Sequence, residues 1–139
     1  MGLIIDTTVF IHAEKRDVAI DFMQWAHLGS AFISAITVSE LLFGVHRANT
    51  PARRRRRQEF VETIISTIPA LDVTAEVARA HAELLARLGP AQSIGAHDAW
   101  IGATAIHNGH AVLTDNVRDF SRLNGLTVVP LFPASPASA

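Results

Sequence analysis

Acidic side chains stand at four widely separated places in the sequence, each where an apolar stretch meets a polar turn or a helix start. They are Asp6, Glu40, Asp98 and Asp115. Carboxylates packed about 4 Å apart repel one another by about 4 kcal/mol per pair at an effective dielectric of about 20, so such a cluster needs a compensating cation. Hard oxygen ligands suit Mg²⁺ or Mn²⁺. The residue types therefore predict a metal-dependent hydrolase that acts on a phosphate ester.

The elements that must position these acids alternate between strands and helices. Apolar runs predict strands at 3–5, 31–34, 71–73, 111–113 and 127–129, and helical periodicity predicts helices at about 17–28, 38–47, 53–68, 74–88 and 97–108. This alternation is typical of an α/β domain with a mostly parallel sheet and helices on both faces. The carboxyl ends of parallel strands share one edge, where distant acids can meet.

A length of 139 residues indicates one domain. We expect the domain to cover residues 1–132, and the Pro, Ala and Ser of residues 133–139 predict a flexible tail. No apolar run reaches the roughly 20 residues of a membrane span, so no membrane contact is predicted. Cysteine is absent, which excludes disulfides and thiolate metal sites and fits a reducing cytoplasm.

The positive charges are almost all arginine, and five of them are consecutive, from Arg53 to Arg57. The net charge is −1, so the chain as a whole does not attract polyanions. Arginine suits phosphate recognition, and positive charge at a helix start opposes the helix dipole. Arg53 and Arg54 are therefore candidate substrate-binding residues, with a solvated helix start as the alternative.

Each acid also has a purely structural interpretation. Asp6 suits an Asx turn or helix cap, and Glu40 closes a capping box that starts at Thr37. Asp98 stands at a helix start, where the dipole favours any carboxylate. Asp115 follows a strand as Asx residues often do, and Asp119 is interpreted as a cap or ion-pair partner. The hypothesis of a site depends on their joint placement.

Three blocks of sequence make the resemblance specific. The chain carries Ile-Ile-Asp-Thr at 4–7, Ile-Thr-Val-Ser-Glu-Leu-Leu-Phe-Gly at 36–44, and His-Asp-Ala-Trp-Ile-Gly-Ala-Thr-Ala at 97–105, which leads into Leu-Thr-Asp-Asn at 113–116 and Arg-Asp-Phe at 118–120. In order and spacing these blocks resemble PIN-domain ribonucleases of the VapC toxin family over nearly the whole chain.

The resemblance implies a three-layer α/β/α domain that cleaves RNA with Mg²⁺ or Mn²⁺, forms homodimers and is neutralised by a small VapB-like antitoxin. Asp6, Glu40 and Asp98 match the first three acidic residues of the family. The fourth position falls on Asn116 or on the adjacent Asp115, and both stay candidates.

The expected mechanism is attack of water on an RNA phosphodiester. Asp6 and Asp98 would hold the principal metal, and Glu40 would complete a second metal position or orient the water. Asp115 or Asn116 would finish the metal shell through water. Thr7 and Thr114 are candidate substrate contacts. Thr114 would fix either the neighbouring carboxylate or a phosphate, and a plain strand-end hydroxyl is the alternative for it.

Two other function classes stay open at this point. One is a catalytically silent PIN-like module that only binds RNA or protein. The other is a phosphotransfer domain with Asp6 as an aspartyl-phosphate acceptor. The second would need either a second acid two residues after Asp6, where Thr8 stands, or a lysine late in the chain, whereas Lys15 is the one lysine.

Overall fold

A five-stranded parallel sheet organises the domain in the computed structural model, which describes residues 1–90 and 92–133. The strands are β1 (Leu3–Ile5), β2 (Ala31–Ser34), β3 (Ala70–Leu71), β4 (Ala111–Thr114) and β5 (Val128–Pro130). They lie in the order β3-β2-β1-β4-β5, and every pair is parallel. The predicted tail at 133–139 lies outside the described residues, except for Pro133.

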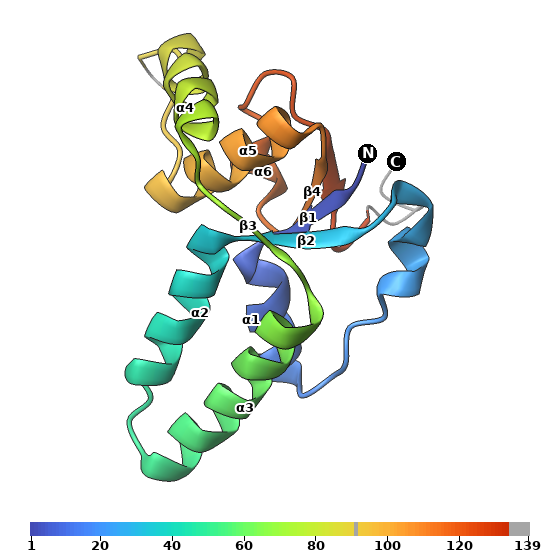
Figure 1. Cartoon of the computed structure of the whole chain (residues 1–139), viewed down its shortest axis with the longest axis vertical. Coiled ribbons are helices and arrows are strands. Elements are labelled where there is room, and N and C mark those ends of the chain that lie inside the picture. The colour runs from blue at the N-terminus through green and yellow to red at the C-terminus, as the bar shows by residue number, and fades with distance from the viewer. Residues whose placement is uncertain (91, 134–139) are drawn as a thin grey trace.

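Helices cover both faces of this sheet, as Figure 1 shows. They are α1 (Thr7–Arg16), the 3₁₀ helix η1 (Phe22–Leu28), α2 (Ala35–His46), α3 (Pro51–Thr67), α4 (Ala75–Arg87), α5 (Ala96–Asn108) and α6 (Val117–Phe120). In the part of the chain that the structure describes, no helix is both long and apolar enough to cross a membrane.

Side-chain alternation along the central strands creates two separate cores. Leu3 and Ile5 of β1 pack with α1, α2 and α3 on one face, whereas Ile4 packs with α4, α5 and α6 on the other. The same alternation places Leu113 in the first core and Val112 in the second. The sheet is thus a middle layer between two helical layers, which confirms the predicted three-layer α/β/α class.

The largest error of the sequence prediction concerns residues 7–28. A helix was expected at 17–28, but α1 occupies residues 7–16, Asp17 ends it with φ +51°, and only residues 22–28 form a 3₁₀ helix. Thr7, Thr8 and Val9 are β-branched and weak helix formers. Burial of Val9 and of other α1 residues in the core overrides that preference.

The start of α2 also differs from the sequence prediction. Its N-cap is Ser34, whose hydroxyl accepts a hydrogen bond from the backbone N–H of Ile36. The predicted capping box from Thr37 to Glu40 is therefore wrong, because both residues lie inside the helix. This leaves the Glu40 carboxylate available to groups outside its own helix.

Candidate active site

The candidate site lies where the carboxyl ends of β1 and β4 meet the first halves of α2 and α5 (Figure 1). Asp6 directly follows β1, and Asn116 follows β4 by two positions. Asp98 lies in the first turn of α5, and Glu40 lies on α2. The backbone N–H of Asp6 donates to the carbonyl of Leu113, which fixes the end of β1 against β4.

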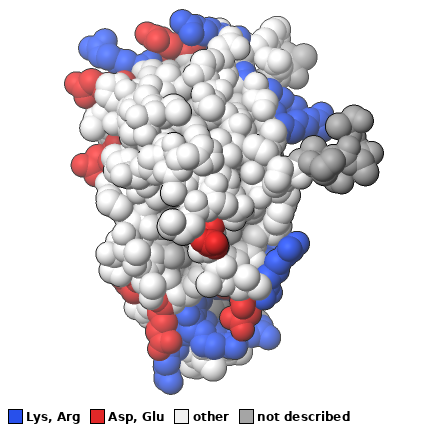
Figure 2. Space-filling view, turned by 90° about the vertical axis from the view of Figure 1, so that its right-hand side faces the viewer, with Lys and Arg blue, Asp and Glu red and all other residues white. Residues whose placement is uncertain are grey.

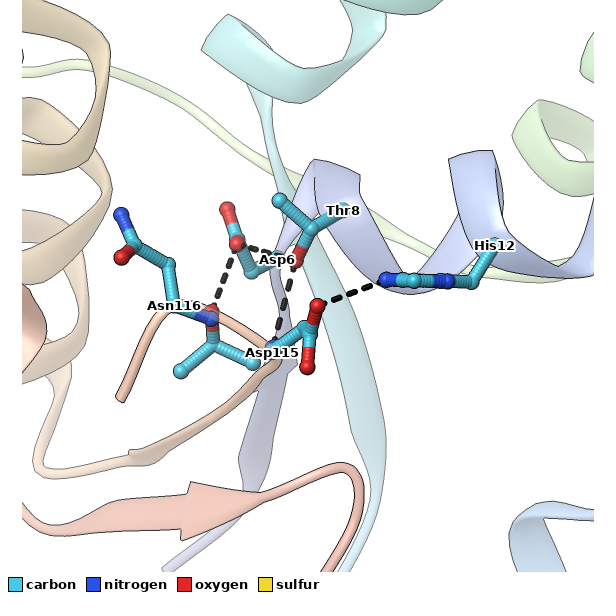
Figure 3. A network of polar contacts seen from close by, with 6 residues as sticks. Asp6, Thr8, His12, Asp115 and Asn116 are labelled. Carbon is cyan, nitrogen blue, oxygen red and sulfur yellow. Dashed lines mark hydrogen bonds and ion pairs between the residues drawn. The ribbon is translucent and has the colours of Figure 1, made fainter. Parts of the chain in front are cut away.

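Asp6 is the buried centre of this site, with 1% of its surface exposed. Two hydroxyls donate to the same carboxylate oxygen, Oδ2: Thr8 Oγ1 at 2.7 Å and Thr114 Oγ1 at 2.7 Å (Figure 3). Burial raises the pKa of Asp6 above its usual value, and the negative charge of Glu40 adds to this, against the two hydroxyls. Thr114 therefore supports the carboxylate, which was one of the roles considered for it.

Glu40 is held by one residue from each side of the site. Thr7 Oγ1 donates to Glu40 Oε1 at 2.8 Å, and the ring of His97 lies with Nδ1 3.1 Å from Glu40 Oε2. The Thr7 hydroxyl also lies 3.0 Å from Thr37 Oγ1, a buried group on the same helix as Glu40. Thr7 thus links the end of β1 to α2 and is a positioning residue in this arrangement.

Asp98 completes the group of interacting carboxylates. Its pKa is raised to about 6, first by burial and then by the negative charges of Asp6, Glu40 and Asp119. Asn116 opposes this rise by donating from Nδ2 to Asp98 Oδ2 at 2.9 Å. Asp6, Glu40 and Asp119, which come from three other segments of the chain, therefore all lie close enough to disfavour the charged form of Asp98.

Asp115 and Asn116 diverge, although they are adjacent in sequence. Asp115 Oδ2 lies 2.6 Å from His12 Nε2 in a pair that is about one third exposed, and Figure 3 shows this carboxylate turned toward α1. The amide of Asn116 instead contacts Asp98. The backbone N–H of Asp115 donates to Thr8 Oγ1 at 3.3 Å, so the residue is linked to Asp6 through Thr8.

Asp119 is the site residue that the sequence interpretation undervalued. Asn116 Nδ2 donates to Asp119 Oδ2 at 3.0 Å as well as to Asp98. The expected ion pair is also present, with Arg122 Nη1 3.3 Å from Asp119 Oδ1. The three-residue spacing from Asn116 on a helical turn was the signal that could have revealed this pairing.

The arginine run lies elsewhere. Arg53 Nη1 donates to Asn49 Oδ1 at 3.0 Å, and Arg54 Nη2 donates to the carbonyl of Ala48 at 3.2 Å. Figure 1 shows the start of α3 at the far end of the α2–α3 hairpin from the strand ends. The structure therefore does not bring Arg53 and Arg54 together with the acidic residues.

The donor set fits a hard divalent cation by its chemistry. All four carboxylates offer oxygen, and their mutual repulsion, visible in the raised pKa of Asp98, is what a cation relieves. Within residues 1–90 and 92–133, no three Asp, Glu or His side chains converge closely enough to bind one ion directly. Water would fill the remaining positions, as is usual for Mg²⁺.

Comparison with known proteins agrees with this arrangement. The family model described as PIN domain matches residues 3–126. Ribonuclease VapC1 of Rickettsia felis is 41% identical, over 93% of this chain and 96% of its own length. The tRNA(fMet)-specific endonuclease VapC of Shigella flexneri is 30% identical, over 91% and 95%. A solved structure of DNA-bound VapBC from Salmonella typhimurium matches with a TM-score of 0.81 at 25% identity, over 94% and 98%.

Proposed function

Because this chain belongs to the PIN-domain family and within it to the VapC ribonucleases, we propose that it is a metal-dependent endoribonuclease restrained by a VapB-like antitoxin. The observation that carries the catalytic part is the gathering of Asp6, Glu40, Asp98 and Asp119 at the ends of β1 and β4, where hydrogen bonds from Thr7, Thr114 and Asn116 hold them. The relatives are named as ribonucleases, which supports RNA as the substrate. We place the activity in the cytoplasm, where RNA and a partner antitoxin are available.

The site residues have two proposed roles, binding of the cation and orientation of the attacking water. When bound, Mg²⁺ or Mn²⁺ supplies positive charge for the phosphodiester and lowers the pKa of attacking water. Asp6 and Asp98 would hold the cation, with Thr8 and Thr114 fixing Asp6 Oδ2. Glu40 would orient the attacking water, because Thr7 and His97 hold both of its oxygens.

Asn116 and Asp119 extend this assignment. Asn116 would keep Asp98 in place, and Asp119 would complete the outer shell of the cation through water. Asp115 is directed to His12, so we assign it a supporting role through Thr8 rather than direct metal binding.

The groove between α1 and α3 is the surface that we propose takes the antitoxin. It has a volume of about 170 Å³ and an almost wholly apolar lining. The lining residues are Phe10, Ala13, Val18, Ala19, Ile20, Phe22, Phe60, Thr63, Ile64, Thr67 and Ile68. An amphipathic helix buries its apolar face in such a groove.

A charged cleft of about 680 Å³ adjoins this groove and shares part of its lining. Arg53, Arg56 and Arg57 line it together with Glu14 and Asp17. Figure 2 shows a broad area nearly free of charged side chains, with charged side chains gathered at the upper and lower ends of the molecule. The arginine run would then contact acidic groups of the antitoxin.

Light scattering of the purified chain tests the homodimer, which stays a prediction.

The proposed activity is tested by incubating total RNA with antitoxin-free wild type and with Asp98→Asn, each with Mg²⁺, Mn²⁺ or chelator. Discrete cuts that need both the metal and Asp98 are expected, and mapping the new RNA ends identifies the target. Asp17→Asn is the matched control, because it makes the same chemical change on an exposed carboxylate at the opposite end of α1 from Asp6.

The other function classes give different outcomes in this experiment. A folded, metal-loaded wild type that leaves all RNA intact would favour the silent binding module. Labelling of the protein by an acyl-phosphate donor would favour the phosphotransfer domain, although Asp6 is only 1% exposed and thus poorly placed as an acceptor.

A further inference from the structure

A line of side chains on α2 runs from the acidic site toward the arginine-rich end of the α2–α3 hairpin. Ile36, Glu40, Phe43 and Arg47 follow one another at spacings of four, three and four residues, so they lie along one side of the helix. Ile36 packs into the core beneath α5, and Glu40 faces His97. Phe43 comes next, about 4.5 Å farther along the helix axis than Glu40.

Phe43 and Phe132 are the two phenylalanines of the described residues whose side chains are largely open to solvent, and Phe43 is the one on the helix that carries Glu40. It is 60% exposed, whereas Trp25 is 8% exposed and Phe10 and Phe120 are buried. Trp100 is stacked on His81, with ring centroids 3.7 Å apart. A single exposed apolar residue is ordinary in itself, so the argument depends on the neighbours of Phe43.

One positive charge, that of Arg47, lies beside the Phe43 ring. Arg47 Cζ lies 5.6 Å from the centroid of the Phe43 ring, within cation–π range. Arg57 Nη1 donates to the carbonyl of Gly44 at 2.9 Å, and Arg54 Nη2 donates to that of Ala48. These bonds hold α3 against the end of α2, and Arg57 is itself paired with Glu14 at 3.0 Å, so Arg47 is the cation that faces the ring.

We propose that Phe43 and Arg47 form a stacking platform for one unpaired RNA base next to the cleaved phosphodiester, an inference that rests on the proposed function and specifies its substrate. Every base has a π face, so stacking on an aromatic ring does not depend strongly on which base is present. It does require a base that is not already stacked on its neighbours in the RNA. Arg47 adds cation–π attraction and a phosphate contact. The platform selects single-stranded or looped RNA.

RNA fits this surface better than a protein partner does. Arg47 at one end of the line suits the backbone of a polyanion, and the carboxylates at the other end require a cation that also binds phosphate. The apolar groove proposed for the antitoxin is lined by residues of α1, of α3 and its C-cap, and of the segment from α1 to the start of η1, whereas Phe43 lies on α2.

Fluorescence of a base analogue tests the stacking directly. Short RNAs spanning the mapped cleavage site, each with one 2-aminopurine at a successive position, are bound to the metal-loaded Glu40→Gln protein, which keeps Asp6 and Asp98. We expect strong quenching at one flanking position. The quenching should persist in Phe43→Trp on the same background and disappear in Phe43→Leu, which keeps an apolar side chain of similar size but has no ring.

Affinity and kinetics give a second, independent readout. Phe43→Ala should weaken RNA binding by about 5- to 150-fold, the range for loss of one stacked base. In wild type, an abasic nucleotide at the quenched position should cause a similar rise in KM, and Phe43→Leu should be insensitive to that nucleotide. Leu85→Ala is the matched control, because Leu85 is an exposed apolar residue, 43% exposed, on α4.

Two outcomes would overturn the platform while leaving the proposed nuclease intact. One is metal- and Asp98-dependent cleavage by wild type with no quenching at any position and equal RNA affinity in Phe43→Leu. The other is unchanged RNA binding with lost inhibition by the antitoxin, which would assign Phe43 to a protein contact. Thermal melting of each variant verifies its fold, and wild type that cuts no RNA contradicts the proposed function itself.

Discussion

The amide of Asn116 holds the carboxylate of Asp98 at 2.9 Å, from a strand end that is 18 residues away in sequence. The same Nδ2 atom donates to Asp119 at 3.0 Å, so one neutral side chain separates two acids. An aspartate at this position would repel both. The amide therefore reduces the repulsion between Asp98 and Asp119 in the metal-free protein, and the carboxylate oxygens of the site remain available for a cation.

Asn116→Asp should change stability and metal affinity in opposite directions. It removes a donor and adds a charge, so the metal-free protein should lose about 1–3 kcal/mol of unfolding free energy. Metal binding should tighten, because another hard oxygen ligand is present. Denaturation in chelator and metal titration measure the two effects.

Asn49→Asp is the control for this change, because it adds the same charge at an exposed site beside Arg53. It should have little effect on either quantity. Equal destabilisation by Asn49→Asp and Asn116→Asp would contradict the interpretation.

Metal-free wild type should lose stability as pH rises from about 4 to about 7. The pKa of Asp98 is 3.8 for the free group and about 6 in the fold, so between these values the native state binds more protons than the unfolded state. By linkage, the unfolding free energy then falls with rising pH. We expect a loss of about 1 kcal/mol, after discounting the full shift for the partial exposure of Asp98.

Denaturant titrations in chelator at a series of pH values measure this slope. Asp98→Asn should reduce it and should be more stable than wild type at pH 7. Saturating Mg²⁺ should stabilise wild type above pH 6 by mass action. An identical pH slope in Asp98→Asn and wild type would show that Asp98 is not the titrating group.

Thr114→Val should weaken both the fold and the site. It removes the hydroxyl that donates to Asp6 Oδ2 and accepts from the backbone N–H of Asn116, at an expected cost of about 1–3 kcal/mol. Losing that donor also raises the pKa of Asp6 further, so metal affinity at neutral pH should fall.

Thr104→Val separates these two effects. Thr104 is equally buried, and its hydroxyl donates to the carbonyl of Trp100 within α5. This variant should lose stability alone. Calorimetric metal titration of both variants makes the comparison, and matched losses of metal affinity would rule out a specific role for Thr114.

Ser34→Ala should destabilise the helix that carries Glu40 by about 1 kcal/mol, because Ser34 is its N-cap. Ser39→Ala makes the same change inside α2, where alanine is the better helix former, and should be neutral or slightly stabilising. Thermal melting distinguishes them. A loss in Ser39→Ala as large as that in Ser34→Ala would contradict the assignment of Ser34 as the N-cap.

Much of this fold could be predicted because its signals are local. The apolar strands at 3–5, 31–34 and 111–113 follow from short apolar runs. The helix after Thr74 follows from its predicted N-cap, and the Thr74 hydroxyl does accept a hydrogen bond from the backbone N–H of Val77. The helix at 7–16 could not be predicted in that way. Its β-branched start is unfavourable locally, and the packing that compensates for it involves distant residues.

The acidic positions were predicted by placement, but their contacts were not. Asp115 and Asn116 are adjacent and chemically similar, so the sequence leaves open which of them faces Asp98. The backbone after β4 decides this by turning Asp115 toward His12. Asp119 was undervalued for the same reason, because its contact with Asn116 depends on the direction that the backbone takes after β4.

The alternation of β4 has a consequence for how this protein can fail. Val112 belongs to one core, Leu113 to the other, and Thr114 reaches Asp6. A shift of β4 by one residue would exchange the two cores and turn Thr114 away from Asp6 at the same time. Single-residue insertions in β4 should therefore yield unfolded chains, whereas folded but inactive proteins should arise from exchanges of individual side chains.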